Sequence, residues 1–316
     1  VVIFLFYGMI LGFAASLILF SLLYVIKDTF AENLSIVNGI VACGSCVGTM
    51  VQSVFIDKLC NHFGWVMVFR VYGILFLIMI LFAFVLEKAY NEYKSKSKNK
   101  AVSKTINENL IVFLVMKNTK YIILCVSTFV VSLGYLVIYL YIQIYAHSNG
   151  VEANKARTLI GYFSIGSLFG RLFFGFVANF IGSRRINVLI LCFFVMGLLN
   201  ILSTFCNSFV GFLIYCIVLG IFDGGFISLL FPVICDMFSK LQRGHVYENK
   251  LEINDDSDQQ NMATAICYFL QGISLMIGPI ITNILIDKVT GISTAFIFSG
   301  LLFITSSLIL ALTYFV

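Results

Sequence analysis

Residues 160–185 read IGYFSIGSLFGRLFFGFVANFIGSRR, an apolar segment that carries one arginine, Arg171, far from either end. Eleven residues separate Arg171 from Gly182, which lies just before the basic pair Arg184 and Arg185. At the rise of an α-helix this is about 16 Å, half the thickness of a bilayer core. An arginine at that depth costs about 2.5–3.5 kcal/mol unless it faces a wet cavity or an acidic partner. The sequence therefore predicts a functional role for Arg171.

A stripe of small and polar residues in the same segment supports this prediction. Its members recur at steps of three or four, so they share one helix face, with Leu, Ile and Phe around the rest: Gly161, Ser164, Ser167, Arg171 and Gly175. The alternative is an arginine that snorkels to the membrane surface. About ten residues separate Arg171 from either helix end, which is further than its side chain can reach.

The whole chain is far more apolar than a water-soluble protein. Hydrophobic residues make up 60% of it and charged residues 11%, with a mean hydropathy of +1.02, against about 45–50% and about 25% in soluble domains. This composition predicts a polytopic membrane protein. The net charge of +5 does not indicate nucleic-acid binding, because the positions of the charges matter more than their sum. The nine cysteines lie mostly inside apolar segments and imply neither a disulfide framework nor a metal site.

Nine apolar windows are long enough to cross a bilayer as helices. They cover residues 1–26, 34–56, 65–86, 120–146, 156–181, 186–206, 209–239, 260–286 and 292–316. The first window starts at Val1 without an initiator Met, a charged n-region or a small-residue cleavage site. We therefore expect a helix from the middle of a longer protein, truncated at its N-terminus, rather than a signal peptide.

The polar stretch 87–119, which contains KSKSKNK, separates three windows from six. It predicts a flexible linker between a partial N-terminal helix bundle (1–86) and a C-terminal six-helix bundle (120–316). If the linker is cytoplasmic, the loops on its side hold fourteen Lys and Arg and the opposite loops hold four. The positive-inside rule then predicts a cytoplasmic C-terminus.

An internal repeat supports this division. Residues 48–58, GTMVQSVFIDK, parallel residues 278–288, GPIITNILIDK, with the same spacing from Gly to the Ile-Asp-Lys ending. The second window thus matches the eighth, six spans apart and in the same direction. Two parallel six-helix halves would give this arrangement, with three helices missing from the start of the first half. A chance match of so short a motif is the alternative.

The segment after Arg171 resembles the loop signature of the major facilitator superfamily, G-x-x-x-D-x-x-G-x-R-R. The matching positions are Gly175, Asn179, Gly182, Arg184 and Arg185. The resemblance implies the major facilitator fold, with two helix bundles and nine of the usual twelve membrane helices present in this chain. In that family the signature clamps helices across the cytoplasmic face. Here Asn179 replaces the acid.

Within that superfamily, the chain resembles the monocarboxylate transporters. Residues 38–48, NGIVACGSCVG, look like the family's N-G-I-x-x-x-G-S-x-x-G helix. Residues 164–179, 219–238 and 271–280 are most similar to the branch that carries thyroid hormones and aromatic amino acids.

Individual residues indicate whether the chain is more similar to the aromatic branch or to the lactate branch of these transporters. The aromatic branch pairs an arginine with an aspartate at the positions of Arg171 and Asp223, whereas the lactate branch places an acid one turn before the arginine, where this chain has Ser167. Tyr141 stands where the aromatic branch has a histidine, so recognition of iodothyronines does not follow.

The residues themselves also indicate a site. Asp223 lies near the middle of an apolar span and is as costly as Arg171 when unpaired, so we expect the two charges to meet. Such a pair either fastens two helices together or presents a cation to a carboxylate substrate. Tyr135 and Tyr139 lie one turn apart, and Tyr139 and Tyr141 are candidates for the wall of a binding cavity, although tyrosine also serves in helix packing.

These features predict a secondary transporter that moves a monocarboxylate, an aromatic amino acid or a related organic acid by alternating access. The alternatives are a proton-coupled lactate or pyruvate symporter and, from another class, a non-transporting remnant or membrane receptor. No catalytic arrangement is recognisable, so we expect no enzyme, cofactor or metal. The expected partners are a small carboxylate and the lipid bilayer, and the expected location is the plasma membrane. The sequence leaves a single-span accessory subunit open.

Overall fold

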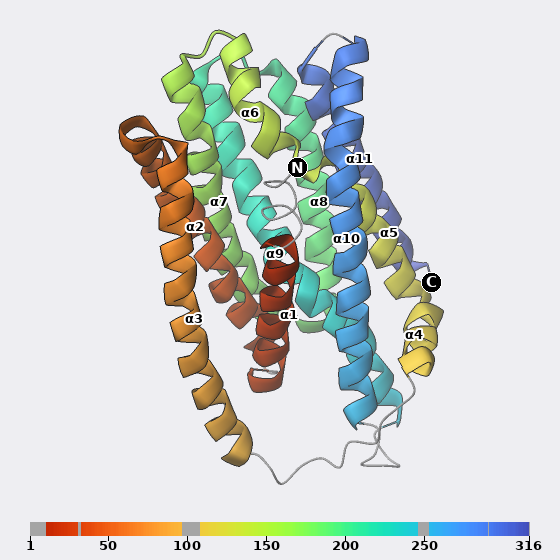
Figure 1. Ribbon diagram of the computed structural model, residues 1–316. Helices are drawn as coiled ribbons and strands as arrows, with labels where there is room; N and C mark the ends of the chain where they lie inside the picture. Colours follow the sequence, from red (N-terminus) through yellow and green to blue (C-terminus); the bar gives the residue numbers. More distant parts are fainter. Residues whose placement is uncertain (1–10, 31–32, 97–107, 246–252, 290, 316) are drawn as a thin grey trace. The chain divides into compact units, whose positions relative to one another are not determined.

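The computed structural model describes residues 11–30, 33–96, 108–245, 253–289 and 291–315. Across these ranges the chain forms α-helices and short 3-10 helices and no strand, which confirms the predicted all-α architecture. The helices of Figure 1 are α1 (Leu11–Thr29), α2 (Leu34–Phe63), α3 (Trp65–Lys96), α4 (Glu108–Lys117), α5 (Thr119–Tyr135), α6 (Val137–Ser148), α7 (Ala153–Ile181), α8 (Arg185–Leu202), α9 (Phe209–His245), α10 (Ile253–Val289) and α11 (Ser293–Ala311).

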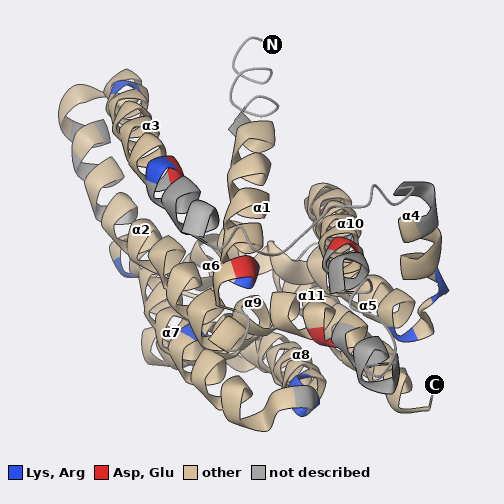
Figure 2. Cartoon of the chain, turned by 90° about the horizontal axis from the view of Figure 1, so that it is seen from below, with Lys and Arg blue, Asp and Glu red and all other residues tan. Residues whose placement is uncertain are grey.

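Nine stretches within the described ranges are long and apolar enough to cross a membrane. They are Gly12–Thr29, Leu34–Gln52, Trp65–Val85, Thr119–Ser148, Ala153–Ile181, Arg185–Phe205, Phe209–Phe238, Asp258–Lys288 and Ser293–Tyr314. Each overlaps one predicted window, and the first ten residues of the first window lie outside the described part. Figure 2 shows how few charged residues the helices carry along their length.

Helix α7 shows how the predicted polar stripe is used. Its outward face carries large, solvent-accessible phenylalanines at steps of three or four, as expected of a surface in contact with lipid: Phe169, Phe173, Phe176 and Phe180. The opposite face carries the buried members of the stripe, Ser164, Ser167, Arg171 and Gly175. The segment that decides the fold therefore presents its polar side to the protein interior.

Two compact units make up the chain: Val1–Val47 with Asn107–Val316, and Gly48–Ile106. The smaller unit contains the second part of α2 and all of α3, joined at Gly64, whose φ of 75° lies in the region that favours glycine. The larger unit contains α1, the first part of α2 and all helices from α4 onward. This division differs from the predicted bundles 1–86 and 120–316, which stay a prediction.

Helices α7 and α9 pack backbone to backbone in the larger unit, as Figure 1 shows. Gly166 and Gly170 of α7 and Gly220 and Gly224 of α9 form the seam, and a Cβ at any of them would overlap the backbone of the facing helix. Small residues at such an interface let membrane helices approach closely. This close approach brings Ser167 of α7 next to Asp223 of α9.

The predicted linker, residues 87–119, contains helical segments. Helix α3 continues to Lys96 and α4 occupies Glu108–Lys117, and the role of this stretch as a flexible linker between two bundles stays a prediction. Helix α4 packs against α10, with Ile111 and Val115 buried one turn apart. Residues 97–107 lie outside the described part.

The fourth predicted span is interrupted. It consists of α5 and α6, with Leu136 between them. Next to this break, Gly134 lies against Ser299 of α11, whose hydroxyl group donates to the Gly134 carbonyl oxygen at 2.9 Å. Interrupted helices in transporters commonly lie at substrate or ion sites, and the residues on both sides of this break belong to the candidate site.

Candidate functional site

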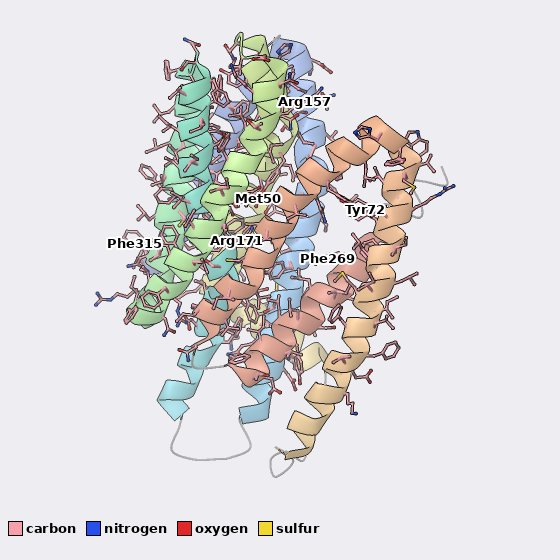
Figure 3. The ribbon with its side chains drawn as sticks, turned by 90° about the vertical axis from the view of Figure 1, so that its left-hand side faces the viewer. Met50, Tyr72, Arg157, Arg171, Phe269 and Phe315 are labelled. Atoms are coloured by element: carbon pink, nitrogen blue, oxygen red, sulfur yellow. The ribbon has the colours of Figure 1, made fainter. Side chains whose placement is uncertain are left out.

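Arg171 of α7 faces the first part of α2, and only 5% of its surface is exposed. Its Nη1 donates to the carbonyl oxygen of Ala42 and to Oγ of Ser45, the latter 2.5 Å away. Helix α2 can approach because Gly39 has no side chain, and a Cβ there would lie 2.7 Å from the Arg171 carbonyl oxygen. Nε of Arg171 is buried without a hydrogen-bond partner, so the guanidinium group keeps an unused donor. Figure 3 labels Arg171 on α7.

Asp223 of α9 is fully buried and is held by two hydroxyl groups. Tyr135 donates to Oδ1 at 2.8 Å, and Ser167 donates to Oδ2 at 2.7 Å. Both carboxyl oxygens therefore have a donor. Ser167 lies one turn before Arg171 on the same face of α7. Ser167, and not Arg171, is the α7 residue that binds Asp223.

The predicted ion pair between Arg171 and Asp223 is wrong. The ion pairs in the described ranges are Glu152–Lys155 and Arg185–Asp236. The physical reason is that Asp223 is satisfied by hydroxyl groups from two helices, while the Arg171 side chain leaves α7 toward α2. Arg171 is thus a buried cation that forms no ion pair with any residue of the described ranges.

Aromatic rings surround Asp223. Tyr135 and Tyr139 lie one turn apart with ring centroids 5.8 Å from each other. Tyr139 meets Phe163 edge to face at 5.3 Å, and Tyr135 meets Phe226 at 5.8 Å. These are favourable geometries for aromatic pairs, so the rings form a packed wall beside the carboxyl group.

The loop after α7 is a separate cluster at the end of the helix. Gly182 ends α7 with a φ of 56°, in the region that favours glycine, and its N–H donates to the Ala178 carbonyl oxygen. Arg185 donates from Nη1 to both oxygens of Asp236 in α9, at 2.9 and 3.0 Å, and from Nε to the Ala178 carbonyl oxygen at 3.1 Å. Asp236 thus joins α9 to this loop.

The other loop residues face α2 or solvent. Asn179 donates to the side-chain oxygen of Asn33 at 3.2 Å. A Cβ at Gly175 would lie 3.0 Å from the Ser35 carbonyl oxygen. The Arg184 side chain is exposed and forms no hydrogen bond or ion pair with the rest of the described chain. The signature therefore connects α7 with α8 and α9, and also with the start of α2.

Comparison with known proteins shows the family to which the chain belongs. The sequence profile described as Major Facilitator Superfamily matches residues 1–248 and again residues 124–316. The chain belongs to the major facilitator superfamily. The overlapping matches also agree with a fold made of repeated halves.

Several curated proteins are similar over most of the chain. Human monocarboxylate transporter 10 is 24% identical over 304 residues, which are 93% of this chain and 55% of that protein. Rat monocarboxylate transporter 4 is 24% identical over 307 residues, which are 96% of this chain and 60% of that protein. The agnestins efflux protein AgnL12 of Paecilomyces divaricatus is 27% identical over 244 residues, which are 77% of this chain and 53% of that protein. The chain spans about half the length of the curated relatives it matches, and the predicted homology to monocarboxylate transporters is confirmed.

Within this major facilitator chain, the structure brings Ser167 of α7 and Tyr135 of α5 to Asp223 of α9 and places Tyr139 of α6 against the ring of Tyr135, whereas the Arg171 side chain is directed toward α2. Tyr141 is half-buried, and its ring is not part of the contacts that join Tyr135, Tyr139 and their neighbours in the described chain. Its role in binding stays a prediction.

Several contributors to this site were not predicted from the sequence. Ser45 and the Ala42 carbonyl group bind Arg171, and Tyr135 donates to Asp223. For Tyr135 a signal exists, because it lies one turn from Tyr139. No comparable pattern indicates that Ser45 faces Arg171.

A small cavity adjoins Asp223. Its volume is about 10 Å³, enough for roughly one water molecule. Polar side chains on its wall include Tyr135, Asn200 and Ser299, and Asn200 accepts a hydrogen bond from the Tyr215 hydroxyl group at 2.7 Å. The cavity is far too small for an organic acid, so a substrate requires another arrangement of these helices.

Proposed function

We propose that this chain is part of a secondary transporter that moves a monocarboxylate, and that the substrate is an aromatic amino acid or a related organic acid. The observation that carries the proposal is Arg171. It is a buried cation, it forms no ion pair in the described chain, and its Nε is an unused donor. A buried donor without a partner costs about 1–3 kcal/mol, more for a charged group. A carboxylate bound to Arg171 would remove that cost.

The chemistry of the guanidinium group favours this class of substrate. Arginine presents a planar fork of N–H donors that matches the two oxygens of a carboxylate, and such paired hydrogen bonds are stronger than neutral ones. Nη1 already binds α2 through Ala42 and Ser45. Separation of α2 from α7 would therefore free further donors for substrate, as alternating access requires.

The rings near Asp223 supply the second part of the proposal. Tyr139 is half-buried and lies at the edge of the wall that also includes Tyr135 and Phe163. An aromatic side chain could stack there with a gain of about 0.5–1.5 kcal/mol beyond its buried area. A three-carbon acid has no ring to place against this wall.

A matched pair of substrates tests carboxylate recognition. Cells that express the full-length protein are given labelled tyrosine in competition with unlabelled phenylalanine or with phenylalanine amide, which differs only at the carboxyl group. We expect phenylalanine to compete and the amide not to. Equal competition by both compounds would contradict a role for a substrate carboxylate.

A proton-coupled lactate or pyruvate carrier is the second candidate. An ion pair with Arg171, which would favour an ionised Asp223, does not form in the described part of the chain. Lactate and tyrosine uptake should therefore be compared at external pH values of about 6 and 7.5. Tyrosine uptake with little dependence on pH supports the proposal, whereas lactate uptake that rises steeply at the lower pH, without competition by aromatic amino acids, favours the symporter. Substrate binding without uptake would favour a receptor.

We further propose that the protein resides in the plasma membrane with its C-terminus in the cytoplasm. The charge bias of the loops supports this orientation, because fourteen basic residues lie on the side of the 87–119 segment and four on the other. Whether a single-span accessory subunit binds the protein is tested by purifying the full-length protein from native membranes and identifying the proteins that co-purify with it.

A further inference from the structure

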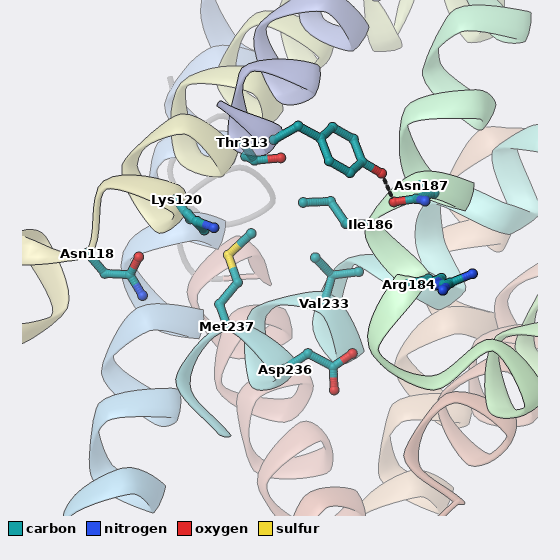
Figure 4. A pocket seen from close by; sticks show the side chains of 10 residues that line it. Asn118, Lys120, Arg184, Ile186, Asn187, Val233, Asp236, Met237 and Thr313 are labelled. Atoms are coloured by element: carbon teal, nitrogen blue, oxygen red, sulfur yellow. Dashed lines mark hydrogen bonds between the residues drawn. The ribbon is translucent and has the colours of Figure 1, made fainter. Parts of the chain in front are cut away.

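A second and much larger cavity lies at one end of the larger unit, away from Arg171. Its volume is about 500 Å³, within the range of ligand-binding pockets. Figure 4 shows the side chains that line it, which come from α8 and the turn before it, from α9, from the first residues of α5 and the residue before them, and from the 3-10 turn after α11: Asn118, Lys120, Arg184, Ile186, Asn187, Val233, Asp236, Met237, Thr313 and Tyr314.

The charge of this cavity is positive. The side chains of Lys120 and Arg184 are exposed, and neither makes a hydrogen bond or an ion pair within the described ranges. The acid in the wall, Asp236, is already bound through both oxygens to Arg185. Two cations thus remain available, and an anion is the ligand that they favour.

The two amide side chains add hydrogen-bond donors. Oδ1 of Asn118 accepts from the Tyr121 backbone N–H at 3.3 Å, and Oδ1 of Asn187 accepts from the Tyr314 hydroxyl group. With both oxygens engaged, each amide keeps its NH₂ group for a ligand. The cavity therefore offers mainly donors, which is the requirement for a phosphate group.

The position of the cavity indicates the source of that phosphate. The lining residues lie at the boundaries of four membrane spans: the starts of Thr119–Ser148 and Arg185–Phe205, and the ends of Phe209–Phe238 and Ser293–Tyr314. These boundaries place the cavity at the level of the lipid headgroups. Ile186, Val233 and Met237 give it an apolar wall as well, which suits the glycerol and the first acyl carbons of a lipid.

We propose that this cavity binds the phosphate headgroup of an anionic phospholipid. Lys120 and Arg184 contact the phosphate, the NH₂ groups of Asn118 and Asn187 donate to its oxygens, and the apolar wall takes the lipid backbone. Basic pockets between membrane helices are known sites for such headgroups. Free phosphate would leave most of a 500 Å³ cavity unfilled.

The test measures lipid binding to the purified full-length protein. Delipidated protein is titrated with phosphatidylglycerol or phosphatidylcholine, and bound lipids are counted by native mass spectrometry. One basic residue near an anionic lipid contributes about fivefold in affinity. We therefore expect Lys120→Gln or Arg184→Gln to weaken phosphatidylglycerol binding about fivefold and the double variant about 25-fold, with phosphatidylcholine binding unchanged.

Two variants serve as matched controls. Lys117 lies three residues before Lys120 but does not line the cavity. Arg157 lies near the start of α7, at the opposite end of this helix from Arg184, as Figure 3 shows. Lys117→Gln and Arg157→Gln should leave the affinity for phosphatidylglycerol unchanged. An equal loss in all four single variants, or no loss in any, would overturn the proposal in favour of a diffuse attraction. Displacement of the lipid by stoichiometric glycerol 3-phosphate would overturn the lipid as ligand and indicate a soluble phosphate compound instead.

Discussion

Replacement of Ser167 by alanine tests how Asp223 is held. In the structure, the Ser167 hydroxyl group donates to Asp223 at 2.7 Å, and both residues are buried. Removal of this hydroxyl group leaves Oδ2 of Asp223 buried without this donor, which costs about 1–3 kcal/mol. We expect Ser167→Ala to lower the free energy of unfolding by about that amount.

Ser164 provides the matched control. It lies one turn earlier on the same face of α7 and is equally buried, but its hydroxyl group donates to the Ile160 carbonyl oxygen within the helix at 3.0 Å. Such a bond adds little to helix stability, so Ser164→Ala should change the free energy of unfolding by less than about 0.5 kcal/mol.

The assay is reversible unfolding of the purified full-length protein in mixed micelles with increasing SDS. A double-mutant cycle of Ser167→Ala with Asp223→Asn isolates the contact itself. Additive effects of the two substitutions, or equal losses for Ser164→Ala and Ser167→Ala, would refute the contact between Ser167 and Asp223.

The sequence predicted the helices well because membrane spans leave a strong signal. Each of the nine apolar windows overlaps an observed candidate span, since a bilayer requires about 20 apolar residues in one run. Helix α4 was missed for the same reason. Its sequence, ENLIVFLVMK, is apolar but only ten residues long, too short to span a membrane, and it lies within a polar stretch.

The site was predicted only in part. Burial of Arg171 and Asp223 follows from their depth in apolar segments. Which groups these charges contact depends on the direction in which each side chain leaves its helix. Spacing along one helix does not reveal that Arg171 reaches α2, or that Tyr135, from another helix, reaches Asp223.

Three further predictions follow from the same contacts and from the loop charges. The charge exchange Arg171→Asp with Asp223→Arg should not restore uptake, because the two side chains form no ion pair; recovery of most of the uptake in the intact protein would show that they pair after all. Valine at Gly170 should cost about 3 kcal/mol because it overlaps the α9 backbone, whereas valine at Gly161, which has open space around it, should be tolerated; similar folded yields for the two would contradict the glycine seam. Single cysteines within residues 94–104 of a cysteine-free protein should resist impermeant thiol reagents in intact cells, and labelling without permeabilisation would reverse the proposed orientation.

The central claim is that Arg171 binds the carboxylate of a transported substrate. The most direct measurement is initial tyrosine uptake by the full-length protein carrying Arg171→Ala, normalised to the amount at the cell surface, with Arg157→Gln as the control. We expect uptake to fall to background for Arg171→Ala and to stay unchanged for Arg157→Gln. Arg171→Lys should keep at most a small part, because lysine keeps the charge but lacks the planar fork of donors. Full uptake by Arg171→Ala, at normal surface expression, would contradict the claim.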